Sequence, residues 1–510
     1  MKHTLITHVA LVTPRSPRLA QLVPSGEPMV RRMQGLMAGA LLLAAPGLRA
    51  ENLFKPDFRI NPDDYTVLTA ADAKLSPGLA RGADDHRKFP VGNWTTSEQL
   101  LAWDIQVAEA ADYAVNVLVE NTASAPVGLE VSCGAGVVKV EAKPASWRRL
   151  PMEGVLPLGA GAQRLTLRAI PAAGMKDFRL NVLSIELVRP AVREKLHQTA
   201  LALRPDTGWF IRARYGIMAH WTSQSMPRQG ERKPYAQAAQ DFDVETVANQ
   251  LADTGAGFFV LTTSHGEQYF PGPNQALDRI LPGRSTRRDL VGDLAEALNK
   301  RGMKLMLYYH LGAADAGEKE WLTASGFWGT DTSVFFENWT SLIGEAGERY
   351  GAKLAGWWFD DGALNYYYRS APWEKLARAA KRGNPQRLIA FNSWQMPSAT
   401  EFQDFDCGEG VDNPAAHGWL TKGGDGRYVD GPNQGLQASV NLTVDGGWLH
   451  GERDKEIGKP RWTPEELASL LRSFEEHKAV PIFNLEIYQE GGFSPASIEL
   501  FKQARSLRRP

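Results

Sequence analysis

The sequence predicts an α/β protein in which an all-β sandwich precedes a (β/α)8 TIM barrel. From about residue 64 to 190, apolar and polar side chains alternate with period two between Gly, Pro and Asn, a pattern typical of antiparallel strands. From residue 209 onward, apolar runs alternate with helical stretches about eight times, which is the rhythm of a (β/α)8 barrel. No Gly-rich dinucleotide loop follows any of these runs, so a doubly wound open sheet is disfavoured.

The first 50 residues predict a leader and a signal peptide. Arg31 and Arg32 precede a short apolar run at 35–45, and a small-residue site ends at Ala50. Charged flank, apolar core and small residue are the three parts of a secretory signal, and the core is too short to span a bilayer comfortably. We therefore expect cleavage near Ala50, a periplasmic or extracellular protein, and no membrane association once the signal is removed.

The next three segments predict a β-sandwich over 51–190, a helical linker over 191–208 and the barrel over 209–510. The sandwich resembles carbohydrate-binding modules in its strand pattern. Trp94, Trp103 and Trp147 could form a sugar platform there, or they could be buried in its core. Its clearest strands are expected at 113–119, 137–140, 164–168 and 178–182.

Within the barrel region, helix-capping residues mark several helices. Asp243 is expected to begin one, Asp289 a second, and Thr463 followed by Pro464 a third. The eight strands are expected at 215–220, 257–262, 304–309, 354–360, 388–392, 402–406, 438–443 and 481–485.

Composition excludes several classes of partner. A formal net charge of −1 and a pI of about 6.8 leave no electrostatic footprint for nucleic acid. The only two cysteines, Cys133 and Cys407, fall in different predicted domains, so neither a disulfide framework nor a zinc site built on Cys pairs is expected. Nothing in the sequence fixes an oligomeric state.

The most informative stretch is the fourth predicted strand, whose apolar run ends in Asp360 and Asp361. Carboxylates are costly to desolvate unless they have partners or a function, and strand C-termini face the active site of a TIM barrel. Asp361 could equally cap the next helix. Asp360, directly behind Trp358, is the stronger candidate for chemistry.

Several other strand ends carry histidines, amides or aromatic rings. Because the C-terminal ends of barrel strands open onto one mouth, these side chains are expected to converge there. They are His220, Trp221, His265, Tyr309, His310, Asn392 and Trp394, and Trp358 and Asp361 of the fourth strand are expected to bind the substrate beside them.

Two chemistries fit this set of side chains. In the first, rings and histidines bind a sugar while Asp360 attacks its anomeric carbon, which requires a second carboxyl about 5–5.5 Å away. In the second, His220, His265, His310 and Asp360 bind a divalent metal that activates water. The sequence lacks a compact His-x-His pair or a His-Glu-x-x-His motif, so the first chemistry is preferred.

Several motifs resemble family 29 glycoside hydrolases, the retaining α-L-fucosidases, in the order that family has them. YGIMAHW at 215–221 resembles the opening "FGIFIHWG", and FDVE with GAGFFVLT resembles "FDAxxW…AGAKYVVLTxKHHDGF". RDLVGDL at 288–294 matches "RDLVGEL", LYY at 307–309 matches "GLYYS", and Trp358-Phe359-Asp360 matches the "WxD" of the nucleophile. PIFNL at 481–485, followed by Gly491-Gly492, resembles "LLLNIGPxxDG".

The resemblance implies that Asp360 is the nucleophile and that His220 binds a sugar hydroxyl. It also points to Glu409 as the general acid/base, because residues 405–409 resemble "DFxTPE"; Glu486 and Glu267 are the runners-up. The implied protein is a secreted, exo-acting, retaining glycosidase that uses no cofactor and no metal, with an oligosaccharide or glycoconjugate as its partner.

Four departures from the family pattern are visible. Ser264 replaces the first member of the family's His-His pair, Trp394 stands where arginine is usual, and His310 stands where serine is usual. The sandwich also precedes the barrel, whereas the family usually carries it afterwards. A non-hydrolytic sugar-binding protein on a decayed barrel therefore remains an alternative, beside the metal-dependent hydrolase.

Overall fold

The computed structural model describes residues 58–82, 90–171, 174–175, 178–310, 319–327, 331–360, 370–394, 396–409 and 411–508. All of these residues fall in one compact unit, Phe54–Pro510. The expected leader and signal peptide lie outside the described residues, as does Asp361. The predicted domain boundaries stay predictions.

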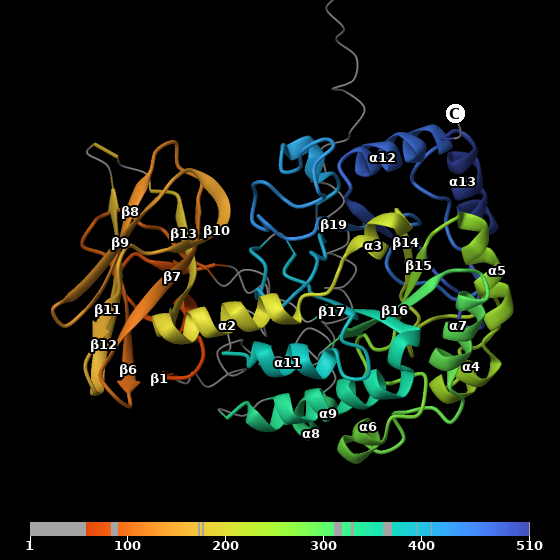
Figure 1. Cartoon of the computed structure of the whole chain (residues 1–510), viewed down its shortest axis with the longest axis horizontal. Coiled ribbons are helices and arrows are strands. Elements are labelled where there is room, and N and C mark those ends of the chain that lie inside the picture. Colours follow the sequence, from red (N-terminus) through yellow and green to blue (C-terminus); the bar gives the residue numbers. More distant parts are fainter. Residues whose placement is uncertain are drawn as a thin grey trace, which may run out of the picture. The chain divides into compact units, whose positions relative to one another are not determined.

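Two mainly antiparallel sheets occupy the N-terminal region, as the period-two pattern predicted (Figure 1). One has the order β1-β6-β12-β8-β9 with β3 beside β6, and the other the order β10-β7-β13-β5-β4 with β11 beside β7 and β2 beside β13. The strands are β1 (Arg59–Ile60), β2 (Thr66–Thr69), β3 (Lys74–Leu75), β4 (Ala80–Arg81), β5 (Val91–Gly92), β6 (Leu100–Val107), β7 (Ala111–Asn121), β8 (Val127–Cys133), β9 (Gly136–Ala142), β10 (Ala145–Pro151), β11 (Leu156–Leu158), β12 (Gly161–Pro171) and β13 (Leu180–Val188).

The three sandwich tryptophans do not form an exposed sugar platform. Trp94, Trp103 and Trp147 are 3%, 1% and 8% exposed, and the indole N–H of Trp103 donates to the Thr69 carbonyl at 2.8 Å. Of the two alternatives, the buried one is therefore correct for all three. Both cysteines are also buried and free of disulfide bonds.

A parallel sheet of seven strands forms the second region, in the order β18-β17-β16-β15-β14-β20-β19. This is the neighbour order of a barrel, since the first strand in sequence lies between the second and the last. Seven of the eight predicted strands thus form within a few residues of their expected bounds. They are β14 (Gly216–Ala219), β15 (Phe258–Thr262), β16 (Lys304–His310), β17 (Leu354–Asp360), β18 (Leu388–Phe391), β19 (Ser439–Thr443) and β20 (Val480–Asn484).

Only the sixth predicted strand, at 402–406, is absent as a regular strand. Asp404 donates its backbone N–H to the Ile389 carbonyl at 2.8 Å, but its side chain then accepts from the Ile389 N–H at 2.9 Å, replacing a ladder bond. Isolated parallel bridges join Phe405 to Gln437 and Glu409 to Asn441. The irregular segment 404–409 thus fills the gap between β18 and β19.

Helices lie around the parallel strands, as the strand-helix rhythm predicted (Figure 1). The expected caps are present: Asp243 accepts from Thr246, Asp289 accepts from Gly292, and Thr463 forms a capping box with Glu466. The helices are α2 (Pro190–Leu203), α3 (Gly208–Ala213), α4 (Tyr235–Asp241), α5 (Val244–Thr254), α6 (Gln275–Ile280), α7 (Leu290–Asn299), α8 (Lys319–Ala324), α9 (Ser333–Tyr350), α11 (Trp373–Ala380), α12 (Pro464–Glu476) and α13 (Pro495–Ser506), with short 3-10 helices at Ala70–Asp72, Gly351–Lys353 and Pro414–His417. Among the helices that the structure describes, none is both long and apolar enough to cross a membrane.

The barrel has its own core, separate from the larger cluster that the surrounding helices share. Alternate residues of β14–β18, of the segment 404–409 and of β20 contribute to it, and Phe210 of α3 joins the same cluster. Its members are Phe210, Met218, Phe258, Val260, Met306, Tyr308, Trp358, Leu388, Ala390, Phe405, Cys407, Val480 and Ile482. This alternation identifies the inward-facing positions of the strands.

Candidate active site

Most of the site is formed by the next inward-facing residue at the C-terminal end of five strands and of the irregular segment 404–409. Two positions after Tyr308 comes His310, two after Trp358 comes Asp360, and two after Ala390 comes Asn392. Because strand side chains alternate between faces with period two, these residues point into the same mouth. In the same way, His220 lies two positions after Met218, Glu409 two after Cys407, and Asn484 two after Ile482.

Asp360 at the end of β17 is held by two neutral donors. The Tyr308 hydroxyl donates to its Oδ2 at 2.6 Å, and the Asn392 amide donates to its Oδ1 at 2.9 Å. Burial opposes ionisation, but the electrostatic effect of His310 and these two hydrogen bonds outweigh it, so the pKa of Asp360 lies below its usual value. Asp360 is therefore a carboxylate at neutral pH.

Glu409 lies close to Asp360, because Asn392 Nδ2 donates to both carboxylates. Two oxygens bonded to one nitrogen by ordinary hydrogen bonds cannot be more than about 6 Å apart. That bound lies near the carboxyl separation of retaining glycosidases, about 5–5.5 Å, and below the inverting range of about 6.5–9.5 Å.

The orientation of the Asn392 amide is fixed by its other end. Its Oδ1 accepts from the backbone N–H of Trp394 at 3.0 Å, so the Nδ2 group must face the carboxylates. Trp394 adopts a φ of 51°, which places it in the left-handed region. The turn after β18 thus places both N–H bonds of one neutral side chain between two acids.

His220 is a neutral imidazole with a defined tautomer. Asn484 donates its Nδ2 to the carbonyls of Gly447 and Trp448, at 3.2 and 2.9 Å, so its Oδ1 faces His220 Nδ1 at 2.7 Å. Nδ1 must then be the protonated nitrogen, which leaves Nε2 as an acceptor. Burial and the neighbouring His265 lower the pKa of His220 to about 3, so the ring stays uncharged at neutral pH.

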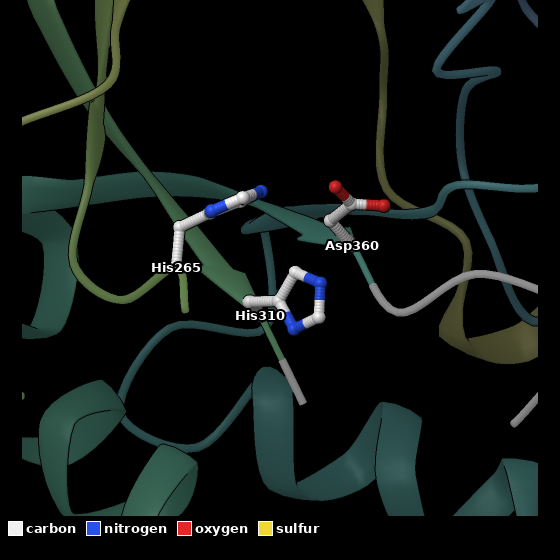
Figure 2. A group of neighbouring side chains, drawn as sticks. All are labelled: His265, His310 and Asp360. Atoms are coloured by element: carbon white, nitrogen blue, oxygen red, sulfur yellow. The ribbon is translucent and has the colours of Figure 1, made fainter. Parts of the chain in front are cut away.

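His265 and His310 lie beside Asp360. Figure 2 shows the three side chains converging on one space from the turn after β15, the end of β16 and the end of β17. Their potential ligand atoms all lie within 4.8 Å of one another, and the two imidazole ring centroids are 5.1 Å apart. His220 is not a member of this group, so the predicted four-ligand metal site is reduced to three residues.

Six of the predicted residues meet in this mouth: His220, His265, His310, Asp360, Asn392 and Glu409. Their catalytic and binding roles stay predictions. Trp358 lies one layer deeper, 1% exposed and stacked on Tyr308 with ring centroids 5.0 Å apart. Trp394 is largely buried, at 9% exposed.

Two predicted site residues, Tyr309 and Trp221, face away from the mouth. Tyr309 lies between Tyr308 and His310 on β16, so alternation turns it toward the outer cluster that also holds Phe359. Trp221 is fully buried; its indole N–H donates to the Gln489 carbonyl at 2.8 Å and its ring packs on Tyr235. Both are corrected to outward-facing core residues.

The runners-up for the acid/base have other partners. Glu486 accepts from the Gly446 N–H at 3.2 Å and lies 3.4 Å from His450 Nδ1. Glu267 is exposed and lines a cavity of about 600 Å³ with residues of three mouth loops. The other lining residues are Gln224, Met226, Glu231, Arg232, Leu449 and Gly451.

Sequence reasoning missed three residues of the mouth: Tyr308, Asn484 and Trp448. The half-buried Trp448 ring lies 5.4 Å from that of His220, on the loop after β19. Tyr308 lies two residues before His310 on β16, so counting back by two from His310 would have found it. Asn484 follows no predicted site residue on its own strand. No local pattern marks Trp448.

Comparisons with known proteins point to one family. Residues 233–423 match the family model described as alpha-L-fucosidase. Tissue alpha-L-fucosidase of Homo sapiens is 29% identical over 163 residues, which cover 25% of this chain and 34% of that protein. The Mus musculus protein of the same name is 30% identical over 147 residues, covering 22% and 32% respectively. The chain thus spans about a third of the length of these curated relatives.

Solved structures with similar backbones include two sugar hydrolases. Alpha-L-fucosidase AlfC from Lactobacillus casei, in complex with its alpha-L-fucose product, has a TM-score of 0.41 and 18% identity, covering 59% of this chain and 97% of its own. Endo-fucoidan hydrolase MfFcnA4 from glycoside hydrolase family 107 has a TM-score of 0.45 and 16% identity, covering 59% of this chain and 54% of its own.

Proposed function

We propose that the chain is an exo-acting, retaining glycosidase for a terminal α-L-fucose or a closely related sugar, because residues 233–423 match the alpha-L-fucosidase family model. One observation supports this most strongly: Asp360 and Glu409 hydrogen-bond to the same Asn392 nitrogen. The shared nitrogen keeps the two carboxylates within about 6 Å of each other, which supports a double displacement.

In the first step, an oxygen of Asp360 attacks the anomeric carbon as the glycosidic C–O bond breaks. Glu409 gives its proton to the departing oxygen, so the leaving group departs neutral. Asn392 and Tyr308 hold the Asp360 carboxylate in place before the attack. A covalent glycosyl-enzyme results.

In the second step, water attacks the anomeric carbon and Glu409 removes its proton. The bond to Asp360 breaks, and the sugar leaves with its original anomeric configuration. His220 accepts a hydrogen bond from a sugar hydroxyl through its unprotonated Nε2, while the Trp448 indole offers an apolar ring beside it.

The stereochemical outcome tests this mechanism. Hydrolysis of an aryl α-L-fucoside, followed by proton NMR during the first minutes, is expected to release the α-anomer before mutarotation. Release of the β-anomer would contradict the double displacement. No hydrolysis of any aryl sugar would instead favour a sugar-binding protein on a decayed barrel.

The acid/base assignment has a separate test. Glu409→Ala is expected to keep turnover of substrates with activated leaving groups, to lose it for poor ones, and to recover rate with azide, which needs no proton removed. Glu486→Ala and Glu267→Ala are the matched controls. Azide rescue in either control, rather than in Glu409→Ala, would move the role to that residue.

We also propose that the protein is exported, on the basis of the signal-like sequence that ends at Ala50. Expression of the full chain in a Gram-negative host, followed by N-terminal sequencing of the periplasmic protein, should give a chain that begins near Glu51. An uncleaved chain in the cytosol would contradict the proposal.

A further inference from the structure

The mouth holds a second arrangement that sugar chemistry alone does not require. His265, His310 and Asp360 present two imidazoles and one carboxylate to a common point (Figure 2). This donor set suits borderline divalent metals such as Zn²⁺, and two histidines with one carboxylate on one face leave positions open for other ligands. His310 is also a position where this chain departs from the family pattern.

We propose that His265, His310 and Asp360 form a binding site for a divalent transition metal of the Zn²⁺ class, and that the bound metal inhibits hydrolysis. The inhibitory half rests on the proposed function, since it requires Asp360 to be the nucleophile. A metal ion on the Asp360 carboxylate withdraws the electron pair that would otherwise attack the sugar.

The observed spacing is close to that of a bound metal. Zn–N bonds of about 2.0–2.1 Å in a tetrahedral site place ligand atoms about 3.3 Å apart. The three ligand atoms lie within 4.8 Å of one another, so they need to approach by no more than about 1.5 Å. His265 lies half-buried on the turn after β15, and a rotation of its side chain would supply this movement.

Asp360 can bind a metal without losing its supporting hydrogen bonds. Each carboxylate oxygen has two lone pairs, and Tyr308 and Asn392 each occupy one. His310 is anchored through its backbone, because its N–H donates to Ser264 Oγ at 3.2 Å and its carbonyl accepts from Gln268 Nε2 at 2.9 Å. The Asp360 carboxylate and the backbone that carries the His310 ring are thus already held in place.

The group of His265, His310 and Asp360 is the candidate metal site among the described residues. Within the part of the chain that the structure describes, no other group of three such side chains meets the same distance limit. One metal ion per chain is therefore the expected stoichiometry.

Isothermal titration calorimetry of the chelator-treated full protein with Zn²⁺ alone tests the binding half. One equivalent is expected to bind to the wild type. Since even the loss of a supporting residue typically costs 10–100-fold in metal affinity, removal of a direct ligand in His310→Ser or His265→Ala should weaken binding by about 100-fold or more. His417→Ala, which changes an exposed histidine outside the group, should bind like the wild type.

Each outcome decides the binding half without any activity measurement. Absence of a one-equivalent site, or unchanged affinity in both variants with native circular dichroism, overturns it. Because two different ligands are varied, failure of one variant to fold still leaves the other to decide.

The inhibitory half is tested with aryl α-L-fucoside as substrate. Zn²⁺ is expected to reduce the rate in competition with substrate, and a chelator to restore it. A rate that rises with Zn²⁺ and falls with chelator would overturn inhibition and favour the metal-dependent hydrolase. Zinc binding without any sugar hydrolysis would leave the metal site intact and reject the proposed function.

Discussion

At the scale of single residues, the chemistry of the site depends on neutral donors placed around one acid. Tyr308 and Asn392 both donate to Asp360, and neither carries a charge. Hydrogen bonds to the ionised form of a carboxyl lower its pKa and fix its direction at once. The Asp360 carboxylate is therefore ionised and held in one orientation.

Removal of the Tyr308 hydroxyl should be visible in the pH profile. Without this donor the pKa of Asp360 rises, so the acid limb of kcat/KM in Tyr308→Phe should move to higher pH. The rate at the optimum should fall roughly tenfold or more, as for a lost hydrogen bond to a charged group. Both are read from kcat/KM between pH 3 and 8.

Tyr309→Phe is the matched control for this change. It removes the same atom from the next residue of β16, which faces the outer cluster. Its acid limb should stay where the wild type has it. A shift in Tyr309→Phe equal to that in Tyr308→Phe would contradict the assignment of inward and outward faces.

The errors at this scale have one physical cause. The location of Asp360, Glu409 and His220 in the mouth could be predicted, because motif order and strand ends marked these residues. Tyr309 and Trp221 were chosen for their ring type, whereas the two-residue period of a strand decides which ring reaches the mouth. Trp448 could not be found, since only the folded chain brings its loop to His220.

At the scale of elements, β18 is positioned by a buried arginine. Arg387, which directly precedes this strand, is fully buried and donates to five backbone carbonyls at 2.7–3.0 Å. Most of these carbonyls lie at the C-terminal ends of α9 and α11, where helices leave carbonyls without partners. The strand so anchored ends at Asn392, the residue between the two acids.

Arg387→Lys should destabilise the protein strongly although it keeps the charge. A lysine cannot supply the planar fork of five donors, so several buried carbonyls would lose their partners. We expect a loss of about 3–5 kcal/mol in the free energy of unfolding, measured by denaturant titration.

Arg378→Ala provides the comparison on α11. Arg378 is exposed and pairs with Glu374 one helical turn away, so its removal should cost less than about 1 kcal/mol. Equal losses in the free energy of unfolding of the two variants would show that Arg387 does not anchor β18.

The irregular sixth position shows what strand patterns leave out. Its residues were expected to form a strand, but Asp404 gives its side chain to the Ile389 N–H and also binds Lys381 at 2.6 Å. Gly408 then adopts a φ of 66°, with the Ser439 carbonyl so close that any Cβ would collide with it. A side-chain hydrogen bond that replaces a backbone hydrogen bond leaves no trace in the pattern of apolar residues. The sequence therefore predicted where this segment lies in the sheet order but not that it is irregular.

At the scale of the whole molecule, several buried carboxyls tie stability to pH. Burial raises the pKa of Asp404 and Asp445 to about 6, and that of Asp406 to about 7. A carboxyl whose pKa is raised on folding favours the folded state most below its unfolded pKa, near 4, and this contribution is lost as pH rises through the folded value. The protein should therefore lose stability between about pH 4 and 7 from these groups.

Asp406→Asn isolates one of these contributions. The amide cannot ionise, so the variant should gain stability relative to the wild type by on the order of 1 kcal/mol per pH unit between pH 5 and 7. Parallel denaturant titrations across that range measure the difference. Asp425→Asn, at an exposed position, should have the same pH dependence of stability as the wild type. If the difference in stability between Asp406→Asn and the wild type does not change with pH, Asp406 does not have the raised pKa assigned to it.

The global architecture was the most predictable level. The number and spacing of apolar runs predicted the barrel because each βα unit repeats a local pattern, and the period-two segments predicted the sheets. The burial of Trp94, Trp103 and Trp147 was left open, because a tryptophan in a strand has the same sequence signature whether it faces solvent or core.

The central claim is that Asp360 forms a covalent bond to the sugar, and trapping that bond tests it most directly. A 2-deoxy-2-fluoro-α-L-fucosyl fluoride slows the second step more than the first, so the glycosyl-enzyme should accumulate. Peptide mapping by mass spectrometry is expected to show one added sugar on Asp360. Attachment of the sugar to any other side chain would contradict this claim. So would turnover of the reagent with inversion at the anomeric carbon and without inactivation of the enzyme.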